Sequence, residues 1–381
     1  MKKLKTLAII VLVLIFAVVL LKVIWGGWSK QQVKLLLLDK TVLNYDYDEH
    51  KSFYWILKYN KYYKENNKPY SYKQDYFGFI PQKPEKNQNY EINRIKITEI
   101  DNLATKYDIL YVIDARGVYF NEWYKGIYSK NKKSLIYGGI SQNDYLLIKK
   151  FIEDSKPTIC EYQLFESPTS GLYRRKTEEV LDVHWSGWTG KYFKSLEDSK
   201  HTEVPGWLIN EYKNRNGGKW PFTKDGIILI KGNEDFIVLE NGTHLNHNMP
   251  ILESSNDFAQ SYSLPAEIDF DRWFEIVSAG NSNTTKASFK LNVNDDGLEA
   301  LSARELDTLF PAIIINNVKP SFYFAGDFSE NHVNMFFSGI ADGEKLGDLF
   351  SGKQSDFFWD YYNPLMKGII KSFTNSLENL P

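Results

Sequence analysis

Cysteine is almost absent from this chain of 381 residues, whose only one is Cys160. A single cysteine excludes an intramolecular disulfide framework and a zinc site built from cysteines alone. An excess of charge of either sign is also lacking, because 46 lysines and arginines balance 48 aspartates and glutamates. Dedicated nucleic-acid-binding proteins usually have an excess of basic residues, which this chain lacks, so we expect no nucleic-acid partner.

Familiar motifs of cofactor and metal chemistry are missing as well. The sequence has no phosphate-binding G-x-x-x-x-G-K-[ST] loop, no G-x-G-x-x-G after a predicted strand and no H-E-x-x-H. No G-x-S-x-G turn is present to carry a nucleophilic serine. We therefore predict neither a cofactor nor a metal site.

One long apolar run, Thr6–Trp25, stands near the start of the chain. Its 20 residues would span about 30 Å as a helix, which is the thickness of a bilayer's hydrocarbon core. Lys2, Lys3 and Lys5 precede the run and predict a cytoplasmic N-terminus. A cleaved signal peptide is the alternative, but its apolar core is usually about 7–15 residues long. We predict a single-pass anchor, residues 1–28, in the inner (cytoplasmic) membrane of a bacterium, with the rest of the chain outside the cytoplasm.

Beyond the anchor, short apolar runs alternate with amphipathic segments. The runs typical of strands buried on both faces are 33–39, 107–114, 158–163 and 321–328, and alternation at 94–100 predicts a further strand. Helical spacing of apolar residues follows at 48–63, and Ser141 and Asp144 form a capping box that opens another helix. This alternation indicates an α/β fold with a mostly parallel sheet.

The texture of the sequence changes near residue 220. Strands are predicted at 226–231, 235–240, 273–278 and 287–293, with Gly, Asn and Ser between them. We therefore divide the chain, after the anchor, into an α/β domain at 31–219, a β-rich section at 220–310 that is inserted or appended, and a return to the α/β domain at 311–381. A helix over about 364–377 closes the chain.

Acidic residues mark the ends of the predicted core strands. Four lie at or near carboxyl ends: Asp39, Asp114, Glu161 and Asp327. In open α/β sheets the ligand crevice lies outside these ends, so we expect the four acids to face one edge of the sheet. Arg116 lies close enough in sequence to offset their charge, and Glu166 lies in the loop beyond Glu161.

Two closely spaced tryptophans, Trp185 and Trp188, are predicted at the rim of this edge. Aromatic faces stack on sugar rings, and carboxylates accept hydrogen bonds from sugar hydroxyl groups. The alternative is that the acids cap helices and the tryptophans fill a domain interface. Two of the acids could instead act as the acid and base of a hydrolase, depending on their separation.

The run YGGISQND at 137–144, followed by a helix and by KPTICEYQLFESPT at 156–169, resembles the class I glutamine-amidotransferase-like superfamily. The resemblance covers about 33–190, with a further part at about 320–330, and implies a flavodoxin-like α/β core. Catalytic members carry their cysteine in a G-x-C-x-G turn, whereas Cys160 lies in TICEY, within a predicted buried strand. The resemblance therefore implies the fold without glutaminase chemistry.

These patterns predict a membrane-anchored extracytoplasmic module with a non-catalytic binding or scaffold role in the cell envelope. Its expected partners are the membrane, through the N-terminal helix, and an envelope glycan or protein. The alternative function is a carboxylate-dependent hydrolase that acts on envelope glycan or peptide.

Overall fold

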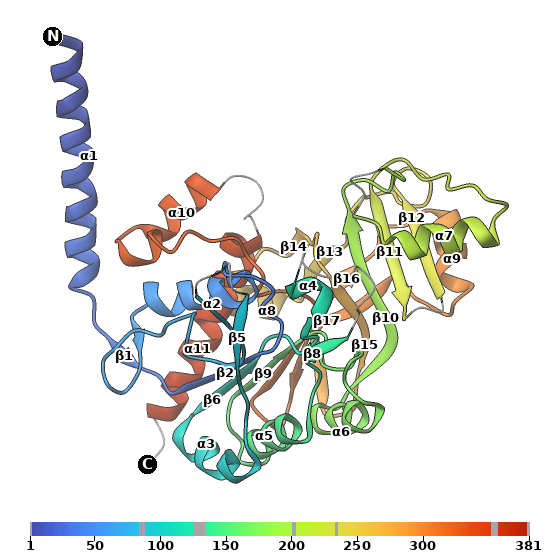
Figure 1. Ribbon diagram of the computed structural model, residues 1–381, viewed down its shortest axis with the longest axis horizontal. Coiled ribbons are helices and arrows are strands. Elements are labelled where there is room, and N and C mark those ends of the chain that lie inside the picture. Colours follow the sequence, from blue (N-terminus) through green and yellow to red (C-terminus); the bar gives the residue numbers. More distant parts are fainter. Residues whose placement is uncertain are drawn as a thin grey trace.

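The N-terminal apolar run forms one helix that projects from the body of the protein. The computed structural model describes residues 2–83, 85, 88–124, 134–199, 203–232, 235–351 and 357–378. Helix α1 (Lys2–Gly26) extends away from the other elements (Figure 1). Residues 3–26 are long and apolar enough to cross a membrane, and none of their most apolar stretch is buried in the protein. The predicted apolar helix is confirmed, while its insertion in a membrane and the direction in which it would cross remain predictions.

The end of α1 is packed against the body and is not joined to it by a flexible tether. The Trp25 indole N–H donates to the Tyr59 carbonyl oxygen at 3.1 Å. The Lys61 ammonium lies 3.5 Å above the Trp25 ring, and Trp28 meets the Tyr59 ring edge-on at 5.3 Å. Only residues 27–30 separate α1 from the first strand, β1 (Gln31–Gln32), which pairs with β3 (Tyr62–Tyr63).

A ten-stranded sheet forms the body, in the order β14-β13-β16-β17-β18-β9-β6-β2-β4-β5. Its five parallel strands are β18 (Ser321–Phe324), β9 (Thr158–Glu161), β6 (Ile109–Val112), β2 (Leu35–Asp39) and β4 (Phe77–Gln82). The antiparallel strands are β5 (Asn89–Asn93), β17 (Leu309–Asn316), β16 (Asn283–Lys290), β13 (Ile251–Ser254) and β14 (Glu267–Asp269). The predicted α/β class is confirmed, but the sheet is mixed, with parallel pairing confined to these five strands.

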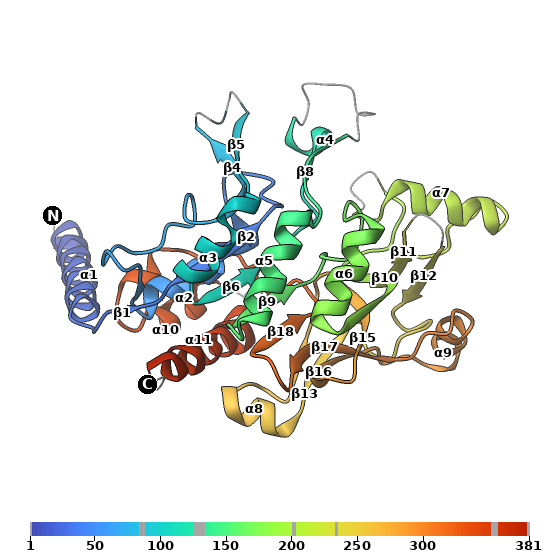
Figure 2. The same ribbon diagram turned by 90° about the horizontal axis from the view of Figure 1, so that it is seen from below.

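Helices cover both faces of this sheet, as Figure 2 shows. One face carries α3 (Ile100–Lys106), α5 (Gln142–Glu153) and α6 (Gly171–Leu181). The other carries α2 (Asp48–Tyr59), α8 (Asn256–Tyr262) and α11 (Asn363–Glu378). A π-helical turn at Phe358–Tyr362 leads into α11. Strands β2, β6, β9 and β18 are buried throughout because both of their faces are covered.

A smaller antiparallel sheet stands beside the first, in the order β12-β11-β10-β15. Its strands are β12 (Asp235–Glu240), β11 (Gly226–Lys231), β10 (Val183–Phe193) and β15 (Phe274–Ala279). Helix α7 (Gly206–Arg215) packs on it through a separate apolar cluster that includes Phe193, Leu208 and Ile228. Helix α9 (Asp295–Ser302) lies next to β12. The strands of residues 220–310 are thus divided between the two sheets.

The remaining elements are short. They are the β7 (Val118–Tyr119) and β8 (Leu135–Tyr137) pair, α4 (Phe120–Trp123), α10 (Gly343–Ser351) and single 3₁₀ turns at Ile97–Glu99 and Phe337–Gly339. The strand predicted at 94–100 is therefore wrong, because that segment forms a 3₁₀ turn and the start of α3. The capping box of α5 is confirmed, since Ser141 and Asp144 bond reciprocally to each other's backbone N–H groups.

Candidate functional site

The order of the parallel strands reverses at β2, which places a crevice at the carboxyl edge of the sheet. Along the chain β4 is added to one side of β2, and β6 and β9 follow on the other. Asp39 is the last residue of β2, and Asp114 comes two residues after β6. The backbone N–H of Lys40 donates to the Asp114 carbonyl oxygen at 2.8 Å, so the two segments lie side by side. Ligands in open α/β sheets bind at such a switch point.

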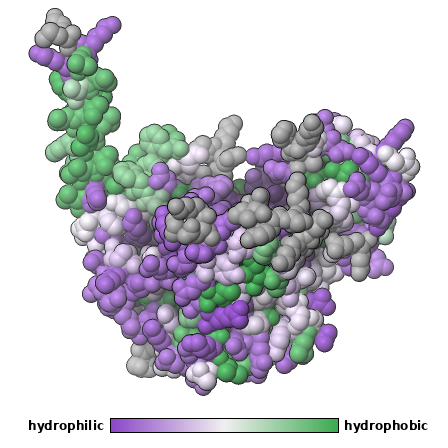
Figure 3. Space-filling model, viewed as in Figure 1, coloured by the Kyte–Doolittle hydropathy of each residue, from purple (hydrophilic) through white to green (hydrophobic). Residues whose placement is uncertain are grey.

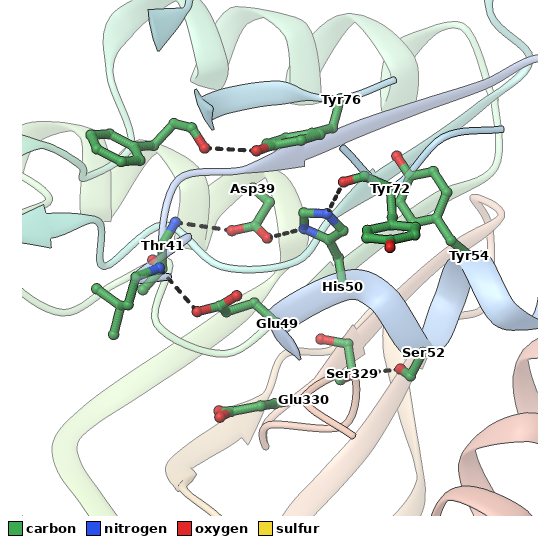
Figure 4. A network of polar contacts seen from close by, with 12 residues as sticks. Asp39, Thr41, Glu49, His50, Ser52, Tyr54, Tyr72, Tyr76, Ser329 and Glu330 are labelled. Atoms are coloured by element: carbon green, nitrogen blue, oxygen red, sulfur yellow. Dashed lines mark hydrogen bonds and ion pairs between the residues drawn. The ribbon is translucent and has the colours of Figure 1, made fainter. Parts of the chain in front are cut away.

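Asp39 is paired with a histidine that lies beneath this edge (Figure 4). Its Oδ2 lies 2.5 Å from His50 Nδ1, and its Oδ1 accepts the Thr41 backbone N–H at 2.9 Å. His50 Nε2 is 2.7 Å from the Tyr72 carbonyl oxygen, which can only accept, so this nitrogen carries a proton. Neither side chain is exposed. Asp39 is therefore part of the internal framework of the site.

Glu161 is likewise held by internal partners. It accepts hydrogen bonds from the Tyr111 hydroxyl and from the Ser329 hydroxyl at 2.9 Å. The Ser329 carbonyl oxygen accepts from Ser52 at 2.5 Å, a contact drawn in Figure 4. Burial raises the pKa of Glu161 to about 8, although the bonds from Tyr111 and Ser329 favour its ionised form.

Asp327 lies at the bottom of the crevice. Its Oδ2 accepts from the Tyr162 hydroxyl at 3.4 Å, and its Oδ1 accepts from the Glu330 backbone N–H at 3.3 Å. Burial, followed by the charge of Glu330, holds the pKa of Asp327 well above its usual range. Together with Asp114 and Glu161, Asp327 lines a small recess of about 10 Å³. The structure thus gathers the strand-end acids at one edge, as their positions predict.

A pocket of about 440 Å³ opens above this recess, between the edge of the large sheet and the smaller sheet. Its acidic members are Glu49, Asp114, Glu166 and Glu330, and its aromatic members are Tyr162, Trp207 and Trp273. Arg116 is its one cation among the described residues, and its guanidinium is paired with Glu122. The pocket wall therefore holds four carboxyl groups and one arginine that is already paired.

Asp114 lines both the recess and the pocket. Its Oδ1 accepts the Arg116 backbone N–H at 2.7 Å. Burial first, and the charge of Asp39 second, raise the pKa of Asp114 to about 7. Burial also raises the pKa of Glu166, while Arg116 acts in the opposite direction. Of the predicted site residues, Asp114, Arg116 and Glu166 line the pocket itself.

Three buried polar atoms of the pocket residues have no hydrogen-bond partner among the described residues. They are Glu49 Oε2, Gln163 Oε1 and Thr189 Oγ1. These residues are 9%, 8% and 5% exposed, so bulk water has little access to them. Buried polar atoms are nearly always bonded to protein groups or to ordered water, so these three are free to accept further hydrogen bonds. Burial and the charge of Asp39 hold the pKa of Glu49 well above its usual range, which favours its neutral form.

The two predicted tryptophans do not lie at the rim. Trp188 is only 3% exposed and belongs to the main core, and Trp185 donates its indole N–H to the Trp188 carbonyl oxygen at 3.1 Å. An irregular register in β10 between Trp185 and Thr189 turns the chain at this point. The tryptophans that line the pocket are instead Trp207, which is 37% exposed, and Trp273. The expectation of accessible faces at Trp188 is therefore wrong.

Several pocket residues lie outside the predicted set. Glu49 comes from the first turn of α2, and Trp207 from the first turn of α7. Gln163 adopts a left-handed φ of 62°, with its backbone N–H bonded to Glu275 Oε1 at 2.9 Å. Glu49 could have been predicted as a site residue from the sequence. It lies in the first turn of α2, which is the next element after β2, and this places it near the carboxyl end of that strand.

The surroundings of Cys160 do not suit a nucleophile. Cys160 is fully buried in β9, and burial raises the pKa of its thiol, which is the opposite of what a nucleophile needs. In the part of the chain that the structure describes, no group of three or more His, Cys, Asp or Glu residues is arranged to hold a metal ion.

Comparison with known proteins gives only distant likenesses. No family model matches the sequence, and no curated protein matches it. A crystal structure of a ThuA-like protein from Bacteroides uniformis is similar over 91% of this chain and 94% of that chain, with 9% identity and a TM-score of 0.38. A GMP synthase subunit from Thermoplasma acidophilum is similar over 92% of this chain and 100% of that chain, with 8% identity and a TM-score of 0.34. At these scores neither likeness indicates a site or an activity.

Proposed function

We propose that the chain is a membrane-anchored, extracytoplasmic module that binds a hydroxyl-rich ligand, such as a sugar unit of an envelope glycan. The ligand would occupy the pocket at the carboxyl edge of the parallel strands. The core is proposed to be flavodoxin-like and related to the class I amidotransferases, with the nucleophile turn absent. The membrane is the inner one, and the N-terminus lies in the cytoplasm.

The observation that carries this proposal is the set of unpartnered atoms at Glu49, Gln163 and Thr189. Carbonyl, carboxyl and hydroxyl oxygens all accept hydrogen bonds from hydroxyl groups. Leaving a buried polar atom unsatisfied costs about 1–3 kcal/mol, which a ligand with several hydroxyl groups would recover on binding. Trp207 and Trp273 also line the pocket, and indole rings can stack on the apolar face of a sugar ring.

Binding is favoured over hydrolysis because two of the strand-end acids are already engaged. Asp39 is paired with His50, and Glu161 is bonded to Tyr111 and Ser329, with neither acid exposed. One observation favours the hydrolase as the second candidate. Asp114, with a pKa raised to about 7, lines the same pocket as Glu166, and a carboxyl group protonated near neutral pH is what a general acid requires.

A panel of sugars tests the proposal on the full chain in detergent micelles. Neutral monosaccharides, amino sugars and N-acetylated sugars are compared by calorimetry, with uronic acids as a negative control because the pocket is acidic. Thr189→Val removes one unpartnered hydroxyl, so it should weaken binding about two- to tenfold without lowering the melting temperature. The matched control is Thr177→Val, because Thr177 also has a buried, unpartnered hydroxyl but does not line the pocket.

The same samples separate binding from catalysis. Release of new reducing ends from glycan fragments by the wild type, and its loss in Asp114→Asn, would favour the hydrolase. If no member of the panel binds, or if the Thr189 and Thr177 variants bind equally well, the proposed site is wrong.

A further inference from the structure

We propose that the surface formed by Phe336, Leu349 and Phe350 lies in the interfacial layer of the membrane that α1 crosses. We call this the α10 surface, because Leu349 and Phe350 belong to α10 and Phe336 precedes the 3₁₀ turn that leads to it. The inference rests on α1 as a membrane span, and it does not depend on the ligand pocket.

Large apolar side chains are concentrated at this surface. Phe336 is 54% exposed, Leu349 is 74% exposed and Phe350 is 70% exposed. Outside α1, six large apolar side chains among the described residues are more than half exposed, and three of the six lie here. The Phe350 ring stacks on Phe337 with centroids 5.8 Å apart and planes 5° apart, so the surface is built from packed rings. Apolar groups gathered in this way mark an interaction surface.

The position of the surface along α1 identifies the bilayer as its partner. The Ala341 backbone N–H donates to the Leu21 carbonyl oxygen at 3.0 Å. Leu21 lies four residues before Trp25, the end of the apolar run, which is about 6 Å of helix. The segment that leads into α10 therefore reaches past the end of the apolar run, toward the depth of the hydrocarbon boundary.

The pictures agree with this placement. Figure 1 shows α10 beside the part of α1 nearest the body, and Figure 3 shows hydrophobic surface over α10 next to the hydrophobic surface of α1. An apolar area that continues from a membrane-spanning helix needs no separate protein partner to cover it. Interfacial helices bury their apolar side about 5–10 Å into the headgroup and acyl boundary.

The orientation of α10 about its own axis also fits an interfacial helix, because it places Glu344 and Gly347 against the protein and Leu349 away from it. Its Glu344 carboxylate faces the protein, where it accepts from Asn363 at 3.2 Å and lies 3.3 Å from the Lys367 ammonium. Gly347 packs so closely on the Trp359 ring that a Cβ there would lie 2.4 Å from it. With these groups turned inward, Leu349 and Phe350 lie on the outer side together with the exposed Lys345 and Asp348, a mixture of apolar and charged groups that suits an interfacial helix.

Spin labels at single introduced cysteines test this placement in the full chain. Cys160 is completely buried and its thiol pKa is raised, so the wild-type background takes up little label, which the unmodified chain checks directly. Labels are placed at Phe350→Cys, at Val318→Cys as a control and at Leu14→Cys within α1. Val318 is a fair control because it is 77% exposed and lies in the turn between β17 and β18.

The chain is reconstituted in nanodiscs of phosphatidylethanolamine and phosphatidylglycerol, and label accessibility to oxygen and to a water-soluble nickel chelate is measured. We expect the oxygen-to-nickel ratio at position 350 to be several-fold higher than at 318 and lower than at 14. A water-like ratio at 350 with a deep position at 14 overturns the inference. Shielding of 350 from both reagents also overturns it, because that result means a protein contact. A water-like ratio at 14 shows instead that α1 does not span the bilayer.

Discussion

Asp114 combines three properties that are rarely found together in a purely structural carboxylate. It is buried, its pKa is raised to about 7, and it lines the same pocket as three unpartnered polar atoms. Asp114→Asn keeps the Oδ1 that accepts from Arg116 but removes the charge. At pH 8 we expect the ligand-free protein to gain about 1 kcal/mol, because a buried charge is removed, while sugar binding weakens.

Thermal melts and calorimetry with the best sugar of the panel measure both effects. Asp307→Asn serves as the control, since Asp307 is exposed in the loop between α9 and β17, and it should change neither quantity. A melting temperature several degrees lower, with binding unchanged, would assign Asp114 a structural role only.

The sequence allowed us to predict that these acids lie at one edge of the sheet, but not which of them are paired internally and which line the pocket. Parallel strands present their carboxyl ends to one edge, so Asp39, Asp114 and Glu161 meet there whatever the loops do. Which of them faces a ligand depends on partners that come from distant segments. His50 of α2 engages Asp39, and Tyr111 of β6 engages Glu161. No local pattern in the sequence reports such pairings.

Among the elements, β15 connects the two sheets through Glu275. Its Oε2 accepts from the Tyr323 hydroxyl of β18 at 2.6 Å, and its Oε1 accepts from the Gln163 backbone at 2.9 Å. Burial raises the pKa of Glu275 to about 8, against about 4.3 in an unfolded chain. Between these values the folded protein holds a proton that the unfolded chain releases, so this group lowers the stability as pH rises from about 4.3 to 8.

Glu275→Gln should reduce that dependence. The amide keeps an acceptor for Gln163 and cannot ionise, so the variant should melt higher than the wild type at pH 8 and similarly at pH 5. Melting temperatures across this range, with the exposed Glu267→Gln of β14 as control, measure the difference. Parallel curves for wild type and Glu275→Gln would contradict the assigned pKa. Some slope should remain, because the raised pKa of Glu161 acts in the same direction.

Element prediction succeeded where burial on both faces leaves a continuous apolar run, as in β2, β6, β9 and β18. It failed at 94–100, where the isoleucines alternate but serve different neighbours. Ile95 and Ile100 are buried at 3% and 7% exposure, whereas Ile97 is 56% exposed on a 3₁₀ turn. The β4–β5 hairpin was missed because β4 contains Gly78 and Pro81, which disfavour a strand, and β5 is short and largely polar. Its pairing depends on β2 beside it rather than on its own pattern.

For the whole molecule, the direction in which α1 crosses the membrane is the main prediction. The lysines before the apolar run favour an N-terminus in the cytoplasm, so a reporter fused after Pro381 should be active only if it functions outside the cytoplasm. An alkaline phosphatase fusion and a green fluorescent protein fusion, compared at equal expression, measure this. Fluorescence without phosphatase activity would reverse the topology and remove the proposed envelope ligand.

The short connection at residues 27–30 limits the positions that the pocket can reach relative to α1. Four residues extend at most about 14 Å, and the docking of Trp25 on Tyr59 and Lys61 leaves even that reach unused. If α1 spans a membrane as we propose, the rest of the chain would stay at one height above the bilayer, whereas a module on a long tether could reach a range of heights. Its pocket would therefore encounter only those molecules that occupy one thin layer parallel to the bilayer.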